Sequence, residues 1–310
     1  MEPEPGRLRL AATLAVGIAA ISSGAVLVKE AQEAPSLTIA FHRMLWAGVA
    51  LSPAYWASVR RRSEASKAAQ RTASADPSRR LWLAFAGLAL ALHFAFWITS
   101  LRYTSVAVSV LLVNTSPILV AGVSYLLFGE RLTARGALGM TLAFLGAAFL
   151  FRHDWQRAGD WRGAALALAG AAALAGYFVA GRRIQQKAAF WSYVYPTYLL
   201  AGGLLGAFAL LAGSRLSGFS TRTWVFLVLL GLIPQGIGHT CYNWSLRHLP
   251  ATVVSTLVLA EPVLAPTWAW LFLGEALGAA EGFGGAFVAA GILLISLGGV
   301  VQSRTAGKAA

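Results

Sequence analysis

Long apolar stretches, each about the length of a membrane-spanning helix, recur along almost the whole chain. A helix needs about 20 mostly apolar residues to cross the hydrocarbon core of a bilayer. The runs are continuous rather than alternating, which favours helices over the strands of a barrel. The sequence therefore predicts an all-α integral membrane protein. Windows of this length predict ten transmembrane helices, at residues 8–28, 37–58, 81–101, 104–127, 133–151, 161–181, 191–212, 223–245, 250–272 and 279–300.

The charged residues support a membrane protein and predict its orientation. Only 12% of the residues are charged, about half the share found in soluble domains. The net charge is +13, but the basic residues lie in the predicted loops rather than on one stripe, so nucleic acid is excluded as a partner. Seventeen of them fall on the side of the N-terminus and seven on the other side. This bias predicts that both termini are cytoplasmic, with lipid headgroups as a minor partner.

Two short signatures occur twice at one spacing. Pro117 and Pro262 are 145 residues apart, and so are the Gly-Glu pairs that end at Glu130 and Glu275. With five predicted spans in each half, an odd number, the second half must enter the membrane from the opposite side. The sequence therefore predicts two inverted five-helix repeats. The same spacing relates two further pairs of glycines, Gly139 with Gly284 and Gly146 with Gly291.

The repeat divides the chain into four parts. We expect a first repeat over 1–151, a linker over 152–162, a second repeat over 163–300 and a cytoplasmic tail over 301–310. The N-terminal apolar run also fits a signal peptide, but a retained first helix keeps the two halves equal and is the preferred interpretation. The single cysteine, Cys241, lies in a predicted span, so no disulfide can form within the chain.

The order of these signatures resembles the EamA-type repeat of the drug/metabolite transporter superfamily. It reads Ala107, Pro117 and Gly129-Glu130 in the first half, and Ala251, Glu261-Pro262 and Gly274-Glu275 in the second, each followed by the two spaced glycines. The resemblance covers residues 8–300. It implies a ten-helix transporter that exports or exchanges small metabolites, often amino acids or drug-like amines. One departure is Ser22-Ser23-Gly24, where the family usually has a Trp-Gly-Ser-like patch.

Ionisable residues inside the predicted spans are the first candidates for a binding site, because charges are costly in hydrocarbon. At a rise of about 1.5 Å per residue, Arg43, His93, Glu261 and Asn114 fall at similar depths. We expect Arg43 and Glu261 to line or gate a central cavity, either singly or as a pair of opposite charges. The structural alternatives are an Arg43 that reaches to the membrane surface and a Glu261 that caps the turn before Pro262.

Two histidines occupy near-equivalent positions in the two halves. His93 and His239 are 146 residues apart, one more than the repeat spacing. Titratable groups at mirrored depths suit alternating access or coupling to a proton or counter-solute. The alternative is a pair of hydrogen-bonded histidines that only pack helices together. The sequence leaves both interpretations open.

Aromatic and amide side chains supply the remaining candidates, since binding pockets are mostly apolar with a few placed polar groups. Prolines within the spans, with Pro117 and Pro262 at equivalent positions, predict symmetric bends around the cavity. Gly129 and Gly274 suit helix ends. Small-residue runs such as 202–206 serve either packing within the chain or a homodimer. The further candidate site residues are Trp97, Tyr177, Tyr198, Tyr242, Asn243 and Trp268.

Several functional classes find no support in the sequence. It contains no His-Glu-x-x-His, Gly-x-Ser-x-Gly or Walker motif, so neither an intramembrane enzyme nor ATP-driven transport is expected, and no cofactor is predicted. We predict a secondary transporter of small organic metabolites, amino acids or related compounds, that works by alternating access. The alternative is a channel or a lipid-scrambling protein. The Ala-, Gly- and Arg-rich composition favours the inner membrane of a bacterium.

Overall fold

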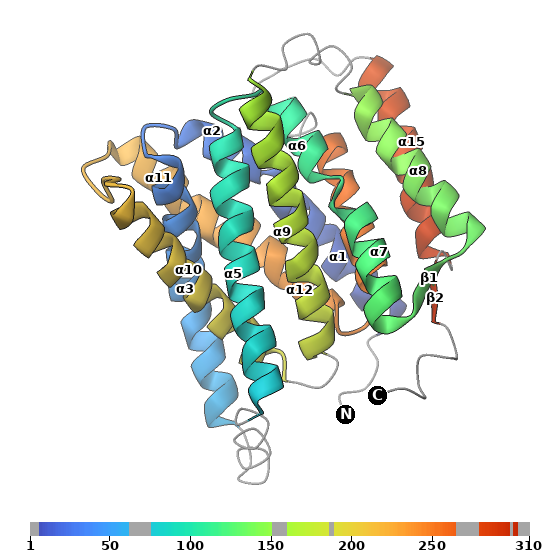
Figure 1. Ribbon diagram of the computed structural model, residues 1–310, viewed down its shortest axis with the longest axis horizontal. Coiled ribbons are helices and arrows are strands. Elements are labelled where there is room, and N and C mark those ends of the chain that lie inside the picture. The colour runs from blue at the N-terminus through green and yellow to red at the C-terminus, as the bar shows by residue number, and fades with distance from the viewer. Residues whose placement is uncertain are drawn as a thin grey trace.

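The protein is a bundle of helices that run roughly side by side (Figure 1). The computed structural model describes residues 6–61, 76–150, 160–185, 189–264, 279–297 and 300–302. The helices of the first half are α1 (Arg7–Ser22), α2 (Gly24–Glu30), α3 (Ser36–Arg60), α5 (Pro77–Ser100), α6 (Val106–Val113), α7 (Ser116–Phe128) and α8 (Ala134–Leu150). Those of the second half are α9 (Trp161–Gln185), α10 (Trp191–Leu211), α11 (Thr221–Leu230), η2 (Gly231–His239), α12 (Thr240–Ser245), α13 (Ala251–Thr256), η3 (Leu257–Ala260) and α15 (Ala279–Ser296).

Many of these helices have the length and composition of membrane spans. Six segments of the described chain are long and apolar enough to cross a bilayer, at Leu8–Glu30, Pro77–Ser100, Val108–Phe128, Trp161–Gln185, Trp191–Leu211 and Thr221–Ser245. Three shorter apolar helices lie at Ala134–Leu150, Ala251–Leu264 and Gly282–Ser296. The helix α3 has 25 residues but also contains His42, Arg43 and Arg60. Helical spans are thus present in both halves, while the total of ten stays a prediction.

The bundle has two ends, which we call proximal and distal. At the proximal end α1 begins and α3, α7, α9 and α12 end (Figure 1). The distal end carries the turn 31–35 and the loop 212–220, which contact each other through Arg215 and Glu33. Of the basic residues that the prediction assigned to loops, eleven described ones lie at the proximal end and five at the distal end.

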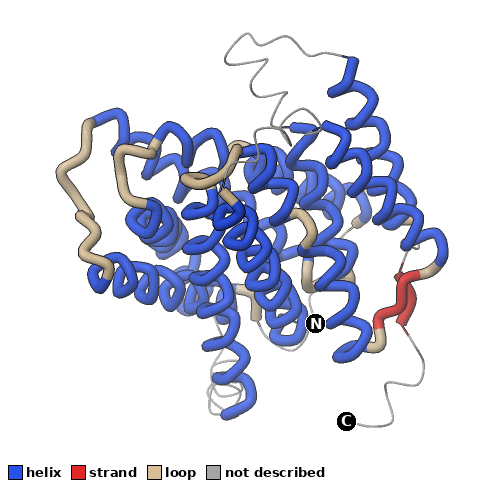
Figure 2. Tube along the Cα trace, turned by 45° about the horizontal axis from the view of Figure 1, so that its top comes forward, coloured by secondary structure: helices blue, strands red, loops and turns tan. Residues whose placement is uncertain are grey.

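A short β ribbon at the proximal end was not predicted. Strand β1 (Glu130–Leu132) pairs antiparallel with β2 (Val300–Gln302), with Glu130 opposite Gln302. Figure 2 shows the ribbon in red at the edge of the helical bundle. It joins the end of α7 to the end of the second half and adds a small β element to the helical architecture that was predicted. The chain turns into β1 at Gly129, whose φ of 65° is the left-handed helix cap expected of a glycine there.

The two halves interlock, because most of the large helix contacts join one helix from each half. Helix α3 packs on α10, α5 on α9, α1 on η2 and α12, α7 on α13, and α8 on α15. The predicted glycine pairs explain the last contact. A Cβ on Gly139 would lie 2.7 Å from the Gly291 carbonyl oxygen, and one on Gly146 would lie 2.7 Å from that of Gly284. These reciprocal contacts are the ones expected when a two-fold axis relates two helices.

Several helices are broken at mid-bundle. The predicted helix over 104–127 divides into α6 and α7 at Asn114 and Thr115, and Pro117 lies in the first turn of α7. Pro117 therefore fits the first turn of α7, where proline is well tolerated, and does not bend a continuous helix. In the second half, Pro234 lies inside η2, a nine-residue π-helix, and the 3-10 turn η3 leads into Glu261-Pro262. Such irregular segments often mark functional sites.

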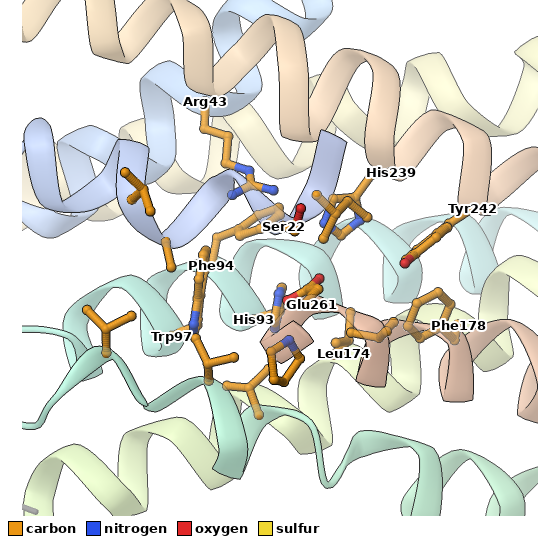
Figure 3. A pocket seen from close by; sticks show the side chains of 18 residues that line it. Ser22, Arg43, His93, Phe94, Trp97, Leu174, Phe178, His239, Tyr242 and Glu261 are labelled. Carbon is orange, nitrogen blue, oxygen red and sulfur yellow. The ribbon is translucent and has the colours of Figure 1, made fainter. Parts of the chain in front are cut away.

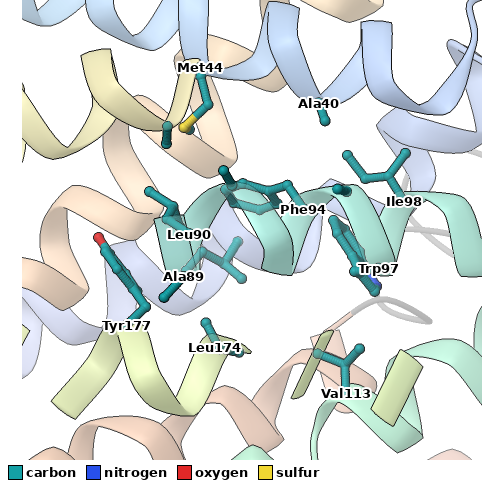
Figure 4. Packing of buried hydrophobic residues seen from close by; sticks show 14 of the residues in the cluster. Ala40, Met44, Ala89, Leu90, Phe94, Trp97, Ile98, Val113, Leu174 and Tyr177 are labelled. Atoms are coloured by element: carbon teal, nitrogen blue, oxygen red, sulfur yellow. The ribbon is translucent and has the colours of Figure 1, made fainter. Parts of the chain in front are cut away.

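The apolar core follows α5 through the centre of the bundle. Figure 4 shows Leu90, Phe94 and Trp97 on one side of this helix, packed among Met44 of α3 and Leu174 of α9. Leu90 and Phe94 are fully buried. These neighbours come from both halves, so the core and the polar groups set into it lie at their junction.

Candidate functional site

A cavity of about 90 Å³ lies at this junction, and its walls come from both halves. Figure 3 shows its side chains, with Arg43 entering from α3 and His93, Phe94 and Trp97 from α5. Most of its surface is apolar, and the polar side chains stand singly in it, as in many small-molecule sites. The polar residues that line it are Ser22, Arg43, His93, His239, Tyr242 and Glu261.

Arg43 is a buried cation held by an amide and two aromatic rings. Only 2% of its surface is exposed. Its Nε donates to Oε1 of Gln235 at 3.1 Å, and its guanidinium carbon lies 4.2 Å from the ring centre of Phe94 and 5.6 Å from that of Trp97. Its Nη1 has no hydrogen-bond partner among the described residues. Aromatic faces attract a guanidinium, but they do not neutralise its charge.

The two predicted histidines face the same cavity. Nδ1 of His93 lies 3.0 Å from the Gly170 carbonyl oxygen. Because a carbonyl only accepts, Nδ1 carries the proton and Nε2 is the acceptor of the neutral ring. His239, at the end of η2, packs edge-on against Phe94, with ring centres 5.4 Å apart, and its Nδ1 has no partner among the described residues. The histidines therefore combine a packing role with exposure of ring nitrogens to the cavity.

Glu261 supplies the one carboxylate among the cavity-lining residues. It follows the 3-10 turn η3 and begins the helical residues 261–264, with Pro262 in their first turn at the cavity wall. Within the described residues, no ion pair of 4.0 Å or less joins Glu261 to Arg43. The two residues share the cavity as predicted, but they face it separately rather than as a direct pair.

Three other predicted residues lie next to the cavity in a hydrogen-bonded cluster. Nδ2 of Asn243 donates to the hydroxyl of Tyr177 at 2.5 Å and to that of Tyr198 at 3.2 Å. All three side chains are buried, and they come from α9, α10 and α12. Asn114 is also buried, at the break between α6 and α7, without a side-chain partner among the described residues. Trp268 lies outside the described residues.

Comparison with known proteins identifies the family. The sequence model that defines the EamA-like transporter family matches this chain twice, over residues 9–152 and 161–297. This chain belongs to the EamA-like transporter family. It is a multi-pass membrane protein of a family that transports small molecules and whose members are not enzymes. The two matches correspond to the two halves that interlock in the structure.

Individual relatives of this EamA-like transporter are distant. An uncharacterized transporter of Archaeoglobus fulgidus is 23% identical, over 66% of this chain and 72% of its own length. The threonine/homoserine exporter RhtA of Salmonella typhimurium is 29% identical over 64% of this chain, which spans only 65% of that exporter. One solved crystal structure aligns with 95% of this chain over 98% of its own length. The TM-score is 0.76 at 20% sequence identity, which shows that the two chains share a fold.

Two important residues of the site were not predicted. Phe94 stacks on Arg43, and Gln235 accepts its hydrogen bond while fully buried. The predicted candidates were Arg, His, Glu, Trp, Tyr and Asn side chains, and neither Phe94 nor Gln235 was among them. A signal was nevertheless present, because Gln235 is an amide that follows Pro234 in a glycine-rich stretch of an apolar span. Polar side chains beside helix-breaking residues are informative in a transporter of this kind.

A second hollow of about 290 Å³ lies on the outside of the bundle, between α3 and α10. Its wall residues Val49 and Leu199 are more than half exposed, and it is lined without any charged side chain. It therefore faces the surroundings of the transporter rather than the junction of its halves. Among the described residues, no group of three or more His, Cys, Asp or Glu is placed to hold a metal ion.

Proposed function

We propose that this EamA-like transporter is a secondary carrier that moves a small organic metabolite, such as an amino acid, through the cavity between its halves. The observation that supports this most is the cavity itself, where ionisable groups from the two halves meet. Arg43 and His93 come from the first half, and His239 and Glu261 from the second. Relative movement of the halves would change the surroundings of all four, as alternating access requires.

The size of the cavity supports a small solute. Sites for drug-sized molecules measure about 300–1,000 Å³, whereas this one measures about 90 Å³. The exporter RhtA, which resembles two thirds of this chain, is named for threonine and homoserine, solutes of this size class. In the proposed carrier, the residues that line the cavity, Trp97 and Tyr242 among them, contact the solute. Tyr177, Tyr198 and Asn243 close the site on its proximal side.

The proposed topology has ten spans in two inverted repeats, with the proximal end in the cytoplasm of a bacterial cell. The excess of basic residues at the proximal end supports this orientation. Because Cys241 is the only cysteine, a Cys241→Ala protein accepts single cysteines at Arg61 and Ser214. Labelling of intact cells with an impermeant maleimide should modify the cysteine at 214 and spare that at 61. The reverse pattern would contradict the orientation.

Counterflow in proteoliposomes tests the carrier. Vesicles loaded with an unlabelled solute should accumulate the labelled solute transiently and saturably, since only a carrier shows trans-stimulation. We expect Glu261→Gln to reduce this flux at least tenfold because it neutralises the one carboxylate of the cavity wall. Coupling to a proton or a counter-solute is measured in the same vesicles by imposing a pH gradient.

The matched control is Asp160→Asn, a carboxylate-to-amide change in the loop before α9. Asp160 pairs with Arg162 at 3.7 Å at the molecular surface, away from the cavity. The control should transport at the wild-type rate. Flux that rises linearly with solute concentration, without trans-stimulation, would contradict the carrier and favour a channel.

A further inference from the structure

The cavity holds a buried arginine, Arg43, that forms no direct ion pair with any described residue. Arg43 is hydrogen bonded only through Nε, to a neutral amide, and Nη1 is unpartnered among the described residues. No carboxylate of those residues lies within 4.0 Å of it. Burying a charge without a partner is costly. A guanidinium kept in this state, and oriented by Gln235 and Phe94, is suited to receive a carboxylate with paired N–H donors.

An acidic side chain faces the same cavity from the other half. Glu261 stands at the opposite wall from Arg43, and both head groups point into the cavity in Figure 3. The cavity thus has one basic and one acidic group on facing walls. A solute with only an anionic or only a cationic group would leave one of them without a partner in a low-dielectric site. A solute that carries both charges and no net charge compensates both walls.

The rest of the cavity surface indicates what the solute looks like beyond its charges. Val110, Val113 and Val258 form apolar wall surface, which suits a short uncharged side chain. Nδ1 of His239 and the hydroxyl of Tyr242 are buried without hydrogen-bond partners among the described residues, so they can meet a side-chain hydroxyl. The small volume leaves little room for more.

We propose that the cavity binds a small neutral α-amino acid as its zwitterion, with Arg43 holding the carboxylate and Glu261 holding the ammonium group. This inference rests on the proposed carrier function and specifies its substrate class. Gln235 is a positioning residue, because it fixes the guanidinium through Nε and leaves Nη1 for the solute. The aromatic rings of Phe94 and Trp97 exclude water from one face of the guanidinium.

The test compares each transported amino acid with two analogues that lack one charge. Labelled alanine, serine, threonine, valine and leucine are screened by counterflow. For each active compound, the amino acid amide removes the carboxylate and the 2-hydroxy acid removes the ammonium group. We expect both analogues to compete about 30-fold more weakly or worse, since each leaves one buried charge unpaired.

Two variants assign the charges to the two residues. Glu261→Gln should lose discrimination against the 2-hydroxy acid, and Arg43→Gln should lose discrimination against the amide, while each keeps the other selectivity. Arg43→Lys retains the positive charge and is measured alongside, in case Arg43→Gln fails to fold. Arg162→Gln and Asp160→Asn are surface controls and should leave both selectivities unchanged, because their ion pair is exposed.

The outcomes separate the inference from the function on which it rests. Trans-stimulated transport of amino acids, with both analogues rejected and the two variants relaxing opposite selectivities, supports zwitterion binding. Trans-stimulated transport in which the amide or the hydroxy acid competes as well as the parent overturns it and leaves the carrier intact. Trans-stimulated transport of organic cations alone would likewise overturn zwitterion binding and leave the carrier intact. No trans-stimulation with amino acids or organic cations counts against the carrier and against zwitterion binding together.

Discussion

Two buried arginines of this transporter have opposite surroundings. Arg182, near the proximal end of α9, has the Glu130 carboxylate 3.5 Å from its Nε and donates from Nη1 to the Leu246 carbonyl oxygen at 2.9 Å. Arg43, in the central cavity, has an amide and aromatic rings but no carboxylate among the described residues within 4.0 Å. The exposed fractions are 8% and 2%, so burial does not explain the difference.

The difference indicates what each arginine does. The Arg182–Glu130 pair joins α9 of the second half to the segment after α7 of the first half, at the end closed by the ribbon β1–β2. The two charges compensate each other within the protein and hold the halves together at the proximal end, although Nε of Arg182 and both Glu130 oxygens have no hydrogen-bond partner among the described residues. Arg43 is incomplete within the protein, and its partner is expected to be the solute. The predictions below test this contrast, from the largest expected effect to the smallest.

Breaking the complete pair should destabilise the protein most. Arg182→Gln leaves the Glu130 carboxylate buried without its cation, and we expect the free energy of unfolding to fall by about 3–5 kcal/mol. It is measured by denaturant titration in mixed micelles. The double variant with Glu130→Gln should recover much of the loss, because the stranded charge is gone. Additive effects of the two changes would contradict a direct pair.

Removing the incomplete cation should have the opposite profile. Arg43→Gln takes an unpaired charge out of a buried site, so stability should stay the same or rise. Transport should fall about 30-fold or more, because the solute carboxylate loses its partner. Thermal unfolding in detergent and counterflow of the same preparation measure the two effects. A loss of stability as large as that of Arg182→Gln would show that Arg43 is structural and that the contrast is wrong.

The sequence predicted Arg43 but missed the importance of Arg182, for a physical reason. Arg43 stands in the middle of an apolar span, where any charge is conspicuous. Arg182 and Glu130 lie at helix ends, where charges look like orientation signals and a Gly-Glu pair looks like a helix cap. Their pairing across 52 positions depends on how the halves pack, which local patterns do not contain.

The same reasoning explains the rest of the fold. The four glycines of α8 and α15 were predictable as repeat equivalents, because the spacing of 145 relates Gly139 to Gly284 and Gly146 to Gly291. Their contacts, Gly139 with Gly291 and Gly146 with Gly284, were not predicted. The π-helix η2 and the ribbon β1–β2 were not, since both depend on contacts between distant segments. In η2, a Cβ on Gly231 would lie 2.3 Å from the Cβ of Trp46, a constraint that only the packed structure reveals.

The contrast can also be reversed at Arg43 itself. Gln235→Glu places a carboxylate where the amide oxygen lies, 3.1 Å from Nε of Arg43, and so gives this arginine the environment of Arg182. A built-in carboxylate competes with that of the solute, and we expect transport to fall about tenfold while the fold is retained. Counterflow measures the flux. Gln235→Leu removes the hydrogen bond without adding a charge and should reduce transport less than Gln235→Glu does. Equal losses of transport in the two variants would exclude competition between the carboxylates as the explanation.

The smallest effect concerns the carboxylates that pair with arginines, and it appears as a pH dependence of stability. Burial raises the pKa of Glu130, against the opposing effects of Arg182 and Thr252. Hydrogen bonds from the Ser220 and Thr223 side chains, at the exposed distal end, lower the pKa of Glu33 from 4.5 to about 2. The folded state therefore binds the Glu130 proton more tightly than the unfolded state does, and the Glu33 proton less tightly.

These shifts have opposite signs in a stability profile. The contribution of Glu130 is complete below pH 4.5 and declines as the pH rises above that value, whereas that of Glu33 is complete above pH 4.5 and is lost as the pH falls towards 2. Unfolding midpoints from pH 3 to 7 should show that Glu33→Gln reduces the loss of stability on acidification. Glu130→Gln should instead reduce the decline above pH 4.5. If the stability of Glu130→Gln declined more steeply above pH 4.5 than that of the wild type, Arg182 would lower the pKa of Glu130 more than burial raises it. The proximal pair would then behave as an ordinary exposed ion pair.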